Sequence, residues 1–281
     1  MDKFKLTKAE RSWILYDVGN SAFILLVTTL VPIYFNNLAE TANLTSSEYL
    51  AYWGYAGSIA TFLVAVIAPL FGTLADRQNY KKKIFFISVI MGAVSCSILG
   101  FAANWLCFLL FFILAKTAYS SSLVFYDSML PDITKESKMD LVSSQGYAFG
   151  YIGSCVPFIL CLILVLFHGK LGLTMNIAMI FAFLLTSIWW ILFTFPLLKH
   201  YKQLKYIQSQ TSPMKESFSR LYHTFRNMKK QKSIFLFLLA FFFFIDGVYT
   251  IIDMATAYGI ALGFDTTGLL LALLTTQIVA F

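Results

Sequence analysis

The stretch Gly72-Thr73-Leu74-Ala75-Asp76-Arg77-Gln78-Asn79-Tyr80-Lys81-Lys82-Lys83 separates two long apolar runs. The stretch itself is short and charged, whereas the flanking runs, residues 51–74 and 84–103, are each long enough to cross the roughly 30 Å of bilayer hydrocarbon as a helix. The pattern therefore predicts a charged hairpin between two membrane-spanning helices, and the rest of the sequence can be interpreted outward from it.

The composition is that of a membrane protein. Of the 281 residues, 59% are hydrophobic and 12% are charged, whereas a soluble domain carries roughly 25% charged residues. Beyond the first two runs, the sequence predicts an eighth span that begins near residue 267 and has about 15 residues left, fewer than the ~20 that a crossing helix needs. The chain is therefore expected to be truncated. The other predicted spans are residues 13–36, 105–126, 144–167, 174–198 and 233–259.

Lysine and arginine are distributed unevenly between the loops. Nineteen of the 21 lie at the N-terminus or in the loops after the second, fourth and sixth spans. Positively charged loops stay in the cytoplasm, so these segments are predicted to be cytoplasmic. The loop after the fourth span, which includes Asp132, is mixed in sign and is expected to be solvated.

Residues 199–232 account for the net charge of +7, because they hold nine Lys or Arg and one acid, Glu216. Apolar residues recur there at helical spacing, which predicts a basic amphipathic helix along the anionic leaflet. A tether between two membrane bundles explains this composition without a nucleic-acid partner. The apolar positions are Phe218, Leu221, Tyr222 and Phe225.

Polar residues line one face of the first span. Asp17, Asn20, Ser21 and Thr28 are spaced by helical periods. Charged groups inside a bilayer usually face a bundle interior or a water-filled cavity. Two interpretations of Asp17 remain: it lines such a cavity, or it is a helix-start charge at the cytoplasmic interface.

The fourth span carries Lys116, with Tyr119, Ser120 and Asp127 on the same helical face. A lysine near the middle of the membrane needs a carboxylate, a substrate anion or a lowered pKa unless its ammonium reaches the interface. Lys116 lies far from both ends of its span, which favours a position facing a cavity.

The seventh span carries two acids, Asp246 and Asp253, with Tyr249 and Thr250 between them. Offsets of helical period place all four on one face. Two acids in one membrane helix favour a functional role over structural pairing.

Small residues form stripes on two other spans. Such stripes let helices approach closely in lipid, as tight packing or as an interface that slides. The second span has Gly54, Gly57, Ser58, Thr61, Ala65, Ala68 and Gly72, and the fifth has Gly146, Gly150, Gly153 and Pro157.

The opening hairpin also resembles a known family. Gly72-x-Leu74-Ala75-Asp76-Arg77, followed by Lys81 and Lys82, resembles the loop between the second and third helices of the major facilitator superfamily of transporters. Asn79 and Tyr80 stand where that motif usually has its second Gly and its first Arg.

Two further stretches resemble one branch of that superfamily. Trp13-Ile14-Leu15-Tyr16-Asp17-Val18-Gly19-Asn20-Ser21-Ala22 is similar to the opening helix of the vacuole effluxers, the autophagy-related amino-acid exporters and their bacterial permease relatives. Asp246-Gly247-Val248 with Thr250-Ile251 is similar to that branch too.

The resemblance implies an all-α membrane protein, a major-facilitator-like helical bundle of which this chain holds the N-terminal six-helix half and the start of the second half. The expected parts are a bundle at 1–198, a basic cytoplasmic linker at 199–232 and the first helices of the second bundle at 233–281. The superfamily lines its cavity mainly with the first, fourth, seventh and tenth helices, and it uses the hairpin motif as a gate. The expected substrate and proton pathway is Asp17, Asn20, Lys116, Tyr119, Asp246, Tyr249 and Asp253, and the expected gating loop is Gly72, Asp76 and Arg77.

The implied function is secondary active transport of a small polar solute, with amino-acid efflux the branch's example, by alternating access and with protons as coupling ions. The alternatives are a truncated fragment without transport activity, or a structural or regulatory membrane protein. An enzyme, a cofactor and a metal site are not expected, because no nucleophile or metal cluster has plausible spacing and the four cysteines lie in apolar spans without a CxxC. The expected location is the cell membrane of a bacterium or the vacuolar membrane of a fungus.

Overall fold

The computed structural model describes residues 5–206, 226–227 and 231–280. Its described helices run in the order predicted from the apolar runs. They are α1 (Lys8–Thr41), α2 (Ser46–Ala75), α3 (Tyr80–Leu99), α4 (Trp105–Ile133), the short 3-10 helix η1 (Glu136–Lys138), α5 (Met139–Leu166), α6 (Met175–His200), α8 (Lys232–Ala261) and α9 (Thr266–Ala280).

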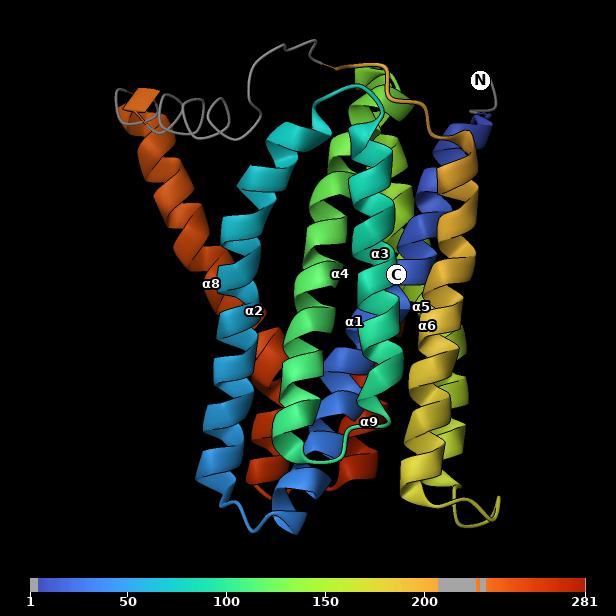
Figure 1. Cartoon of the computed structure of the whole chain (residues 1–281), viewed down its shortest axis with the longest axis vertical. Coiled ribbons are helices and arrows are strands. Elements are labelled where there is room, and N and C mark those ends of the chain that lie inside the picture. Colours follow the sequence, from blue (N-terminus) through green and yellow to red (C-terminus); the bar gives the residue numbers. More distant parts are fainter. Residues whose placement is uncertain (1–4, 207–225, 228–230, 281) are drawn as a thin grey trace.

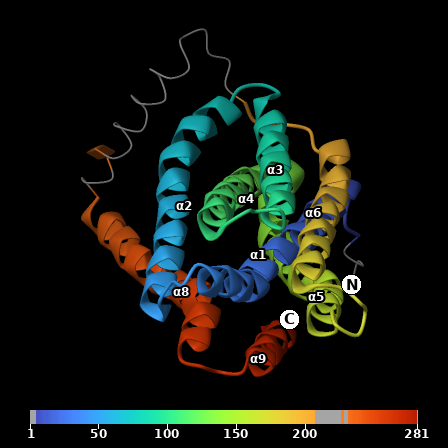
Figure 2. The same ribbon diagram turned by 60° about the horizontal axis from the view of Figure 1, so that its bottom comes forward.

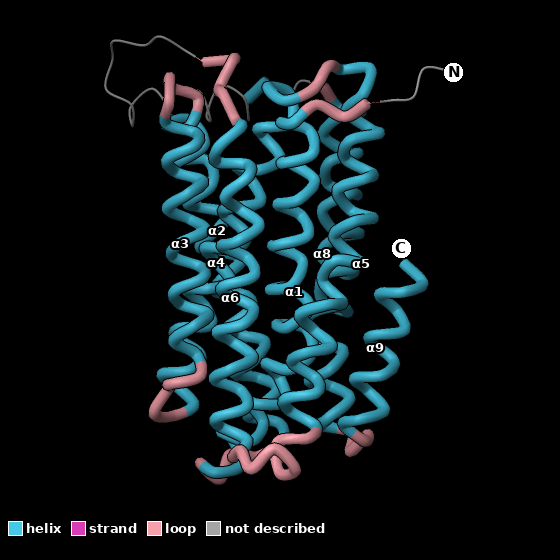
Figure 3. Tube along the Cα trace, turned by 90° about the vertical axis from the view of Figure 1, so that its right-hand side faces the viewer, coloured by secondary structure: helices cyan, strands magenta, loops and turns pink. Residues whose placement is uncertain are grey.

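The long helices stand side by side along one axis, with their connections at the two ends (Figures 1 and 3). The start of α1, the α2–α3 turn and the end of α6 lie at the same end, hereafter the basic end (Figure 1). Within the described ranges, seven helices are long and apolar enough to cross a membrane, and α9 is a shorter apolar helix. The predicted all-α membrane bundle and its spans are confirmed, while the predicted helix around Phe218–Phe225 lies outside the described residues.

Helix α1 is the centre of the bundle and is buried along most of its length. It packs tightly against α5 because α5 presents glycines. A Cβ atom added at Gly150 would lie 2.8 Å from Ser21 Oγ, and one added at Gly153 would lie 2.5 Å from Val18 Cγ1. The small-residue stripe of the fifth span therefore serves close helix packing.

The corresponding stripe on α2 has a different environment. A Cβ atom added at Gly54 or Gly72 would meet no described atom within 4 Å, and one added at Gly57 would meet only Lys116 Nζ, at 3.9 Å. Among the described residues, no helix backbone therefore packs closely against these three glycines.

Aromatic side chains fix α4 and α6 against α1. The rings of Phe23 and Tyr119 have centroids 4.9 Å apart, and Trp190 of α6 lies 5.3 Å from Phe23 and 5.8 Å from Tyr119. Nearer the basic end, Trp13 stacks on Tyr126 at 4.2 Å. Such offset and tilted pairs add about 0.5–1.5 kcal/mol each beyond the area that they bury.

A proline in α1 creates the acceptor through which α8 docks. Pro32 lies inside α1 and has no backbone N–H, so the carbonyl of Thr28, four residues earlier, has no donor within the helix. Thr256 of α8 donates its hydroxyl to that carbonyl at 2.5 Å. A neighbouring helix thus restores the hydrogen bond that the proline removed, as helices in lipid require.

Helix α8 touches the first six helices through its later part. Its buried residues are Thr256, Ala257 and Gly259, whereas no side chain of residues 232–252 is buried. Figure 1 shows the beginning of α8 standing apart from the other helices at the basic end. Seen from the opposite end in Figure 2, α8 lies beside α2 and α1, and α9 lies beside α5.

Candidate functional site

Among the described residues, one ion pair within the membrane-spanning helices joins α4 to α8. Lys116 Nζ lies 2.5 Å from Asp253 Oδ2, and the two side chains are 10% and 28% exposed. The ammonium also lies 6.0 Å from the centroid of the Phe112 ring. Trp53 of α2 donates its indole N–H to the backbone carbonyl of Asp253 at 3.1 Å. Three helices therefore converge on one acid of the seventh predicted span.

This pair explains how a lysine is accommodated far from both ends of a membrane-spanning helix. Its ammonium is neutralised by a carboxylate within the bundle, so it has no need to extend to the interface. Removing either partner of a buried pair leaves an uncompensated charge, which is strongly destabilising. The arrangement can therefore hold α8 against α4 and can release it when another charged group takes over one partner.

Asp17 is buried between α1 and α5, with 7% of its surface exposed. Its Oδ1 accepts a hydrogen bond from Asn20 Nδ2 at 3.0 Å, and Asn20 also donates to the Tyr16 carbonyl at 3.2 Å. A Cβ atom at Gly146 would lie 3.1 Å from Asp17 Oδ2, so the glycine makes room for the carboxylate. The acid of the helix start is instead Glu10, which forms a capping box with Thr7.

Among the described residues, no hydrogen bond or ion pair links the other predicted pathway residues to Lys116 or Asp253. Tyr119 is buried in the aromatic cluster with Phe23 and Trp190. Asp246 and Tyr249 are exposed on α8. Of the four polar positions on that face of α8, Asp253 forms an ion pair with α4 among the described residues.

The predicted gating loop is a tight turn at the basic end. The backbone N–H of Asp76 donates to the Gly72 carbonyl at 3.1 Å, and that of Arg77 donates to the Leu74 carbonyl at 3.1 Å. Asn79 has φ of 66°, a left-handed conformation. Asparagine tolerates this region better than most residues do, which explains how it replaces the glycine that is usual there.

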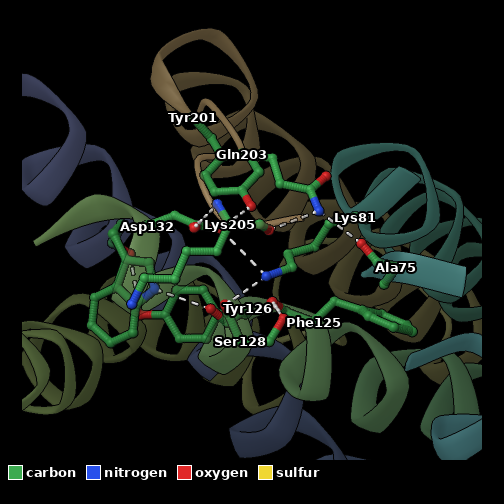
Figure 4. A network of polar contacts seen from close by, with 10 residues as sticks. Ala75, Lys81, Phe125, Tyr126, Ser128, Asp132, Tyr201, Gln203 and Lys205 are labelled. Atoms are coloured by element: carbon green, nitrogen blue, oxygen red, sulfur yellow. Dashed lines mark hydrogen bonds and ion pairs between the residues drawn. The ribbon is translucent and has the colours of Figure 1, made fainter. Parts of the chain in front are cut away.

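A buried polar network that residue spacing did not predict lies beside this turn. Asp132 was expected in a solvated loop, but it lies within α4, is 8% exposed and forms an ion pair with Lys81 at 3.3 Å. Figure 4 shows that Tyr201 and Gln203, which follow α6, reach the same place. The available signal was the position of Asp132 directly after Pro131, six residues beyond the apolar span 105–126.

Seven apolar helices of spanning length, with charged and polar groups paired inside the bundle, define an integral, multi-pass membrane protein. The chain matches the family described as "Vacuole effluxer Atg22 like" over residues 7–281 and belongs to that family. The predicted superfamily and branch are thereby confirmed.

Named relatives agree with this assignment. The chain is 41% identical to the uncharacterized MFS-type transporter YxiO of Bacillus subtilis, over 98% of this chain and 66% of that protein. It is 23% identical to autophagy-related protein 22 of Vanderwaltozyma polyspora, over 88% of this chain and 59% of that protein. The chain thus spans less than two thirds of the length of these relatives.

Proposed function

We propose that the protein is a secondary transporter that moves a small polar solute across its membrane by alternating access. The observation that carries this proposal is the Lys116–Asp253 ion pair, which joins the first six helices to α8 inside the membrane. A charge pair between two parts of a bundle is a contact that can exist in one access state and be exchanged in another.

The placement of α8 supports an arrangement open toward the basic end. The Asp253 and Thr256 contacts lie in the later part of α8, away from the basic end, whereas residues 232–252 carry no buried side chain. Closing that end while opening the other requires the Lys116–Asp253 contact to separate.

The proposed substrates are amino acids, on the strength of the vacuole-effluxer family, and the proposed coupling ion is the proton. A membrane carboxylate can carry a proton because loss of solvation favours its neutral form. The 41% identity to a transporter of Bacillus subtilis favours the cell membrane of a bacterium over a vacuolar membrane.

Transport of a labelled amino-acid panel into and out of proteoliposomes tests the function directly. With the full-length protein, we expect a pH gradient to accelerate movement of at least one amino acid. Asp246→Asn is expected to lose that acceleration, because an amide cannot carry the proton, while exchange without a gradient persists. Asp140→Asn, an exposed acid at the start of α5, is the matched control. Wild-type gradient-driven transport by Asp246→Asn would count against proton coupling through this residue.

Asp76→Ala tests the role of the gating loop. Asp76 is exposed at the end of α2, outside the bundle core, so its removal is expected to leave substrate affinity unchanged. We expect the maximal transport rate to fall about tenfold, which is ~1.4 kcal/mol on the barrier between access states. Initial rates across a range of substrate concentrations separate the two quantities. Gln78→Ala, in the same turn, serves as control, and an unchanged rate for Asp76→Ala would refute the role.

A further inference from the structure

The chain does not leave the bundle where α6 ends. Residues 201–205, hereafter the strap, continue from His200 along the basic end toward α4, α3 and α2 (Figures 1 and 4). Tyr201, its first residue, is only 4% exposed although it lies beyond the helix. The beginning of the basic linker is therefore fastened to the first six helices.

Asp132 is the point at which the strap is fastened. Its Oδ2 accepts hydrogen bonds from the Tyr201 hydroxyl at 2.7 Å and from Lys81 Nζ at 3.3 Å, and its Oδ1 accepts the Lys205 backbone N–H at 2.9 Å. Burial raises the pKa of Tyr201, and the hydrogen bond to Asp132 raises it further, so the hydroxyl remains a donor. One carboxylate thus satisfies donors from the strap and from α3.

Asp132 and Lys81 are not placed to stabilise their own helices. Asp132 lies in the last turn of α4 and Lys81 in the first turn of α3, where the helix dipoles disfavour an acid and a base, respectively. Their side chains are 1% and 7% exposed, so both charges are removed from water. Their favourable partners are each other, the strap and the Ser128 carbonyl, to which Lys81 Nζ donates at 3.0 Å.

A second contact ties the strap to α2. Gln203 Nε2 donates to the carbonyl of Ala75 at 2.9 Å. Ala75 is the last residue of α2, and carbonyls in the final turn of a helix lack partners within the helix. The turn of residues 76–79 is therefore held on both flanks, by Gln203 at Ala75 and by Asp132 at Lys81.

We propose that the strap positions the gating turn, with Asp132, Tyr201 and Gln203 as positioning residues. The strap keeps the ends of α2 and α3 at a fixed spacing, so that the turn moves with the first six helices as one body. It also attaches the beginning of the basic linker to α3 and α4. Movement of the helices that follow the linker therefore pulls on the first six helices together rather than on α6 alone. The functional part of this inference rests on the proposed transport activity.

Hydrogen exchange of the full-length protein in lipid nanodiscs tests the structural part without transport. Peptides covering 201–206 and 73–81 are followed in the wild type, Asp132→Ala, Tyr201→Phe and Gln203→Ala. Loss of one hydrogen bond to a charged group predicts about tenfold faster exchange of residues 201–206 in Tyr201→Phe, and loss of all three predicts a larger increase in Asp132→Ala. Gln203→Ala is expected to accelerate exchange of residues 73–81. Glu136→Gln, an exposed acid beyond the end of α4, is expected to change neither peptide.

Transport by the same variants tests the positioning role. Tyr201→Phe and Gln203→Ala are expected to lower the maximal rate about threefold or more at unchanged half-saturating concentration, whereas Glu136→Gln keeps wild-type values. Unchanged exchange of residues 73–81 in both variants would overturn the inference. Faster hydrogen exchange of residues 73–81 at wild-type transport rates would overturn it too, because the contacts of the strap would then contribute to structure but not to transport. A wild type that transports none of the amino acids tested contradicts the proposed function. In that case the hydrogen-exchange results alone test whether the strap holds the turn in place.

Discussion

Asp253→Asn is expected to reduce transport by more than about tenfold and to destabilise the protein. The substitution leaves the Lys116 ammonium, 10% exposed, without its carboxylate. Breaking a fully buried pair costs ~3–5 kcal/mol, and because the Asp253 side chain retains 28% exposure we expect ~2–3 kcal/mol. Initial transport rates and thermal unfolding monitored by tryptophan fluorescence measure the two effects.

A double variant separates stability from transport. Lys116→Met with Asp253→Leu removes both charges, so no buried charge is left alone, and replacing such a pair by apolar residues is often neutral or stabilising. We expect the double variant to unfold near the wild-type temperature and yet to transport poorly. Wild-type stability in both single variants, Lys116→Met and Asp253→Asn, would show that the pair does not hold α8 against α4.

Gly153→Leu is expected to have the largest effect on stability among the helix-packing substitutions. Its Cβ atom alone would lie 2.5 Å from Val18 Cγ1, and the rest of the leucine side chain would push α5 away from α1. Overpacking of this kind costs ~1–3 kcal/mol, and more where backbones must separate. A fall in the unfolding temperature, accompanied by loss of transport, is the expected result.

Gly54→Leu is the control for this substitution. A Cβ atom at Gly54 meets no described atom within 4 Å, so a larger side chain has room. We expect its unfolding temperature to stay within the error of the wild-type value. If Gly153→Leu is equally stable, the close approach of α1 and α5 is not required for the fold.

The fold follows from signals that depend on short stretches of sequence. Apolar runs of spanning length predict α1 to α6, α8 and the shorter α9, and the uneven distribution of Lys and Arg predicts which of their connections share the basic end. The same reasoning identified Lys116 and Asp253 separately, because each is costly inside a membrane. It did not pair them, since helical periodicity defines the face on which a residue lies but not the helix that this face meets.

Contacts distant in sequence explain what the sequence analysis missed. Asp132 sits among charged residues at a helix end and resembles a solvated acid. It is buried because residues 201–205 return to cover it. The glycines show the same dependence on distant contacts. Gly150 and Gly54 belong to similar stripes, yet a Cβ atom added at Gly150 would meet Ser21, whereas one added at Gly54 would meet no described atom within 4 Å. Residue spacing alone does not distinguish a packed stripe from an open one.

Pro32 has a consequence for how the protein is made. Helix α1 enters the membrane before α8 has been synthesised, and during that interval the Thr28 carbonyl lacks the Thr256 hydroxyl that pairs with it in the finished protein. An unpaired carbonyl in hydrocarbon costs several kcal/mol, so another donor, such as water or a neighbouring side chain, is needed until α8 arrives. Helix α1 therefore acquires its final hydrogen bonding only when α8 is inserted.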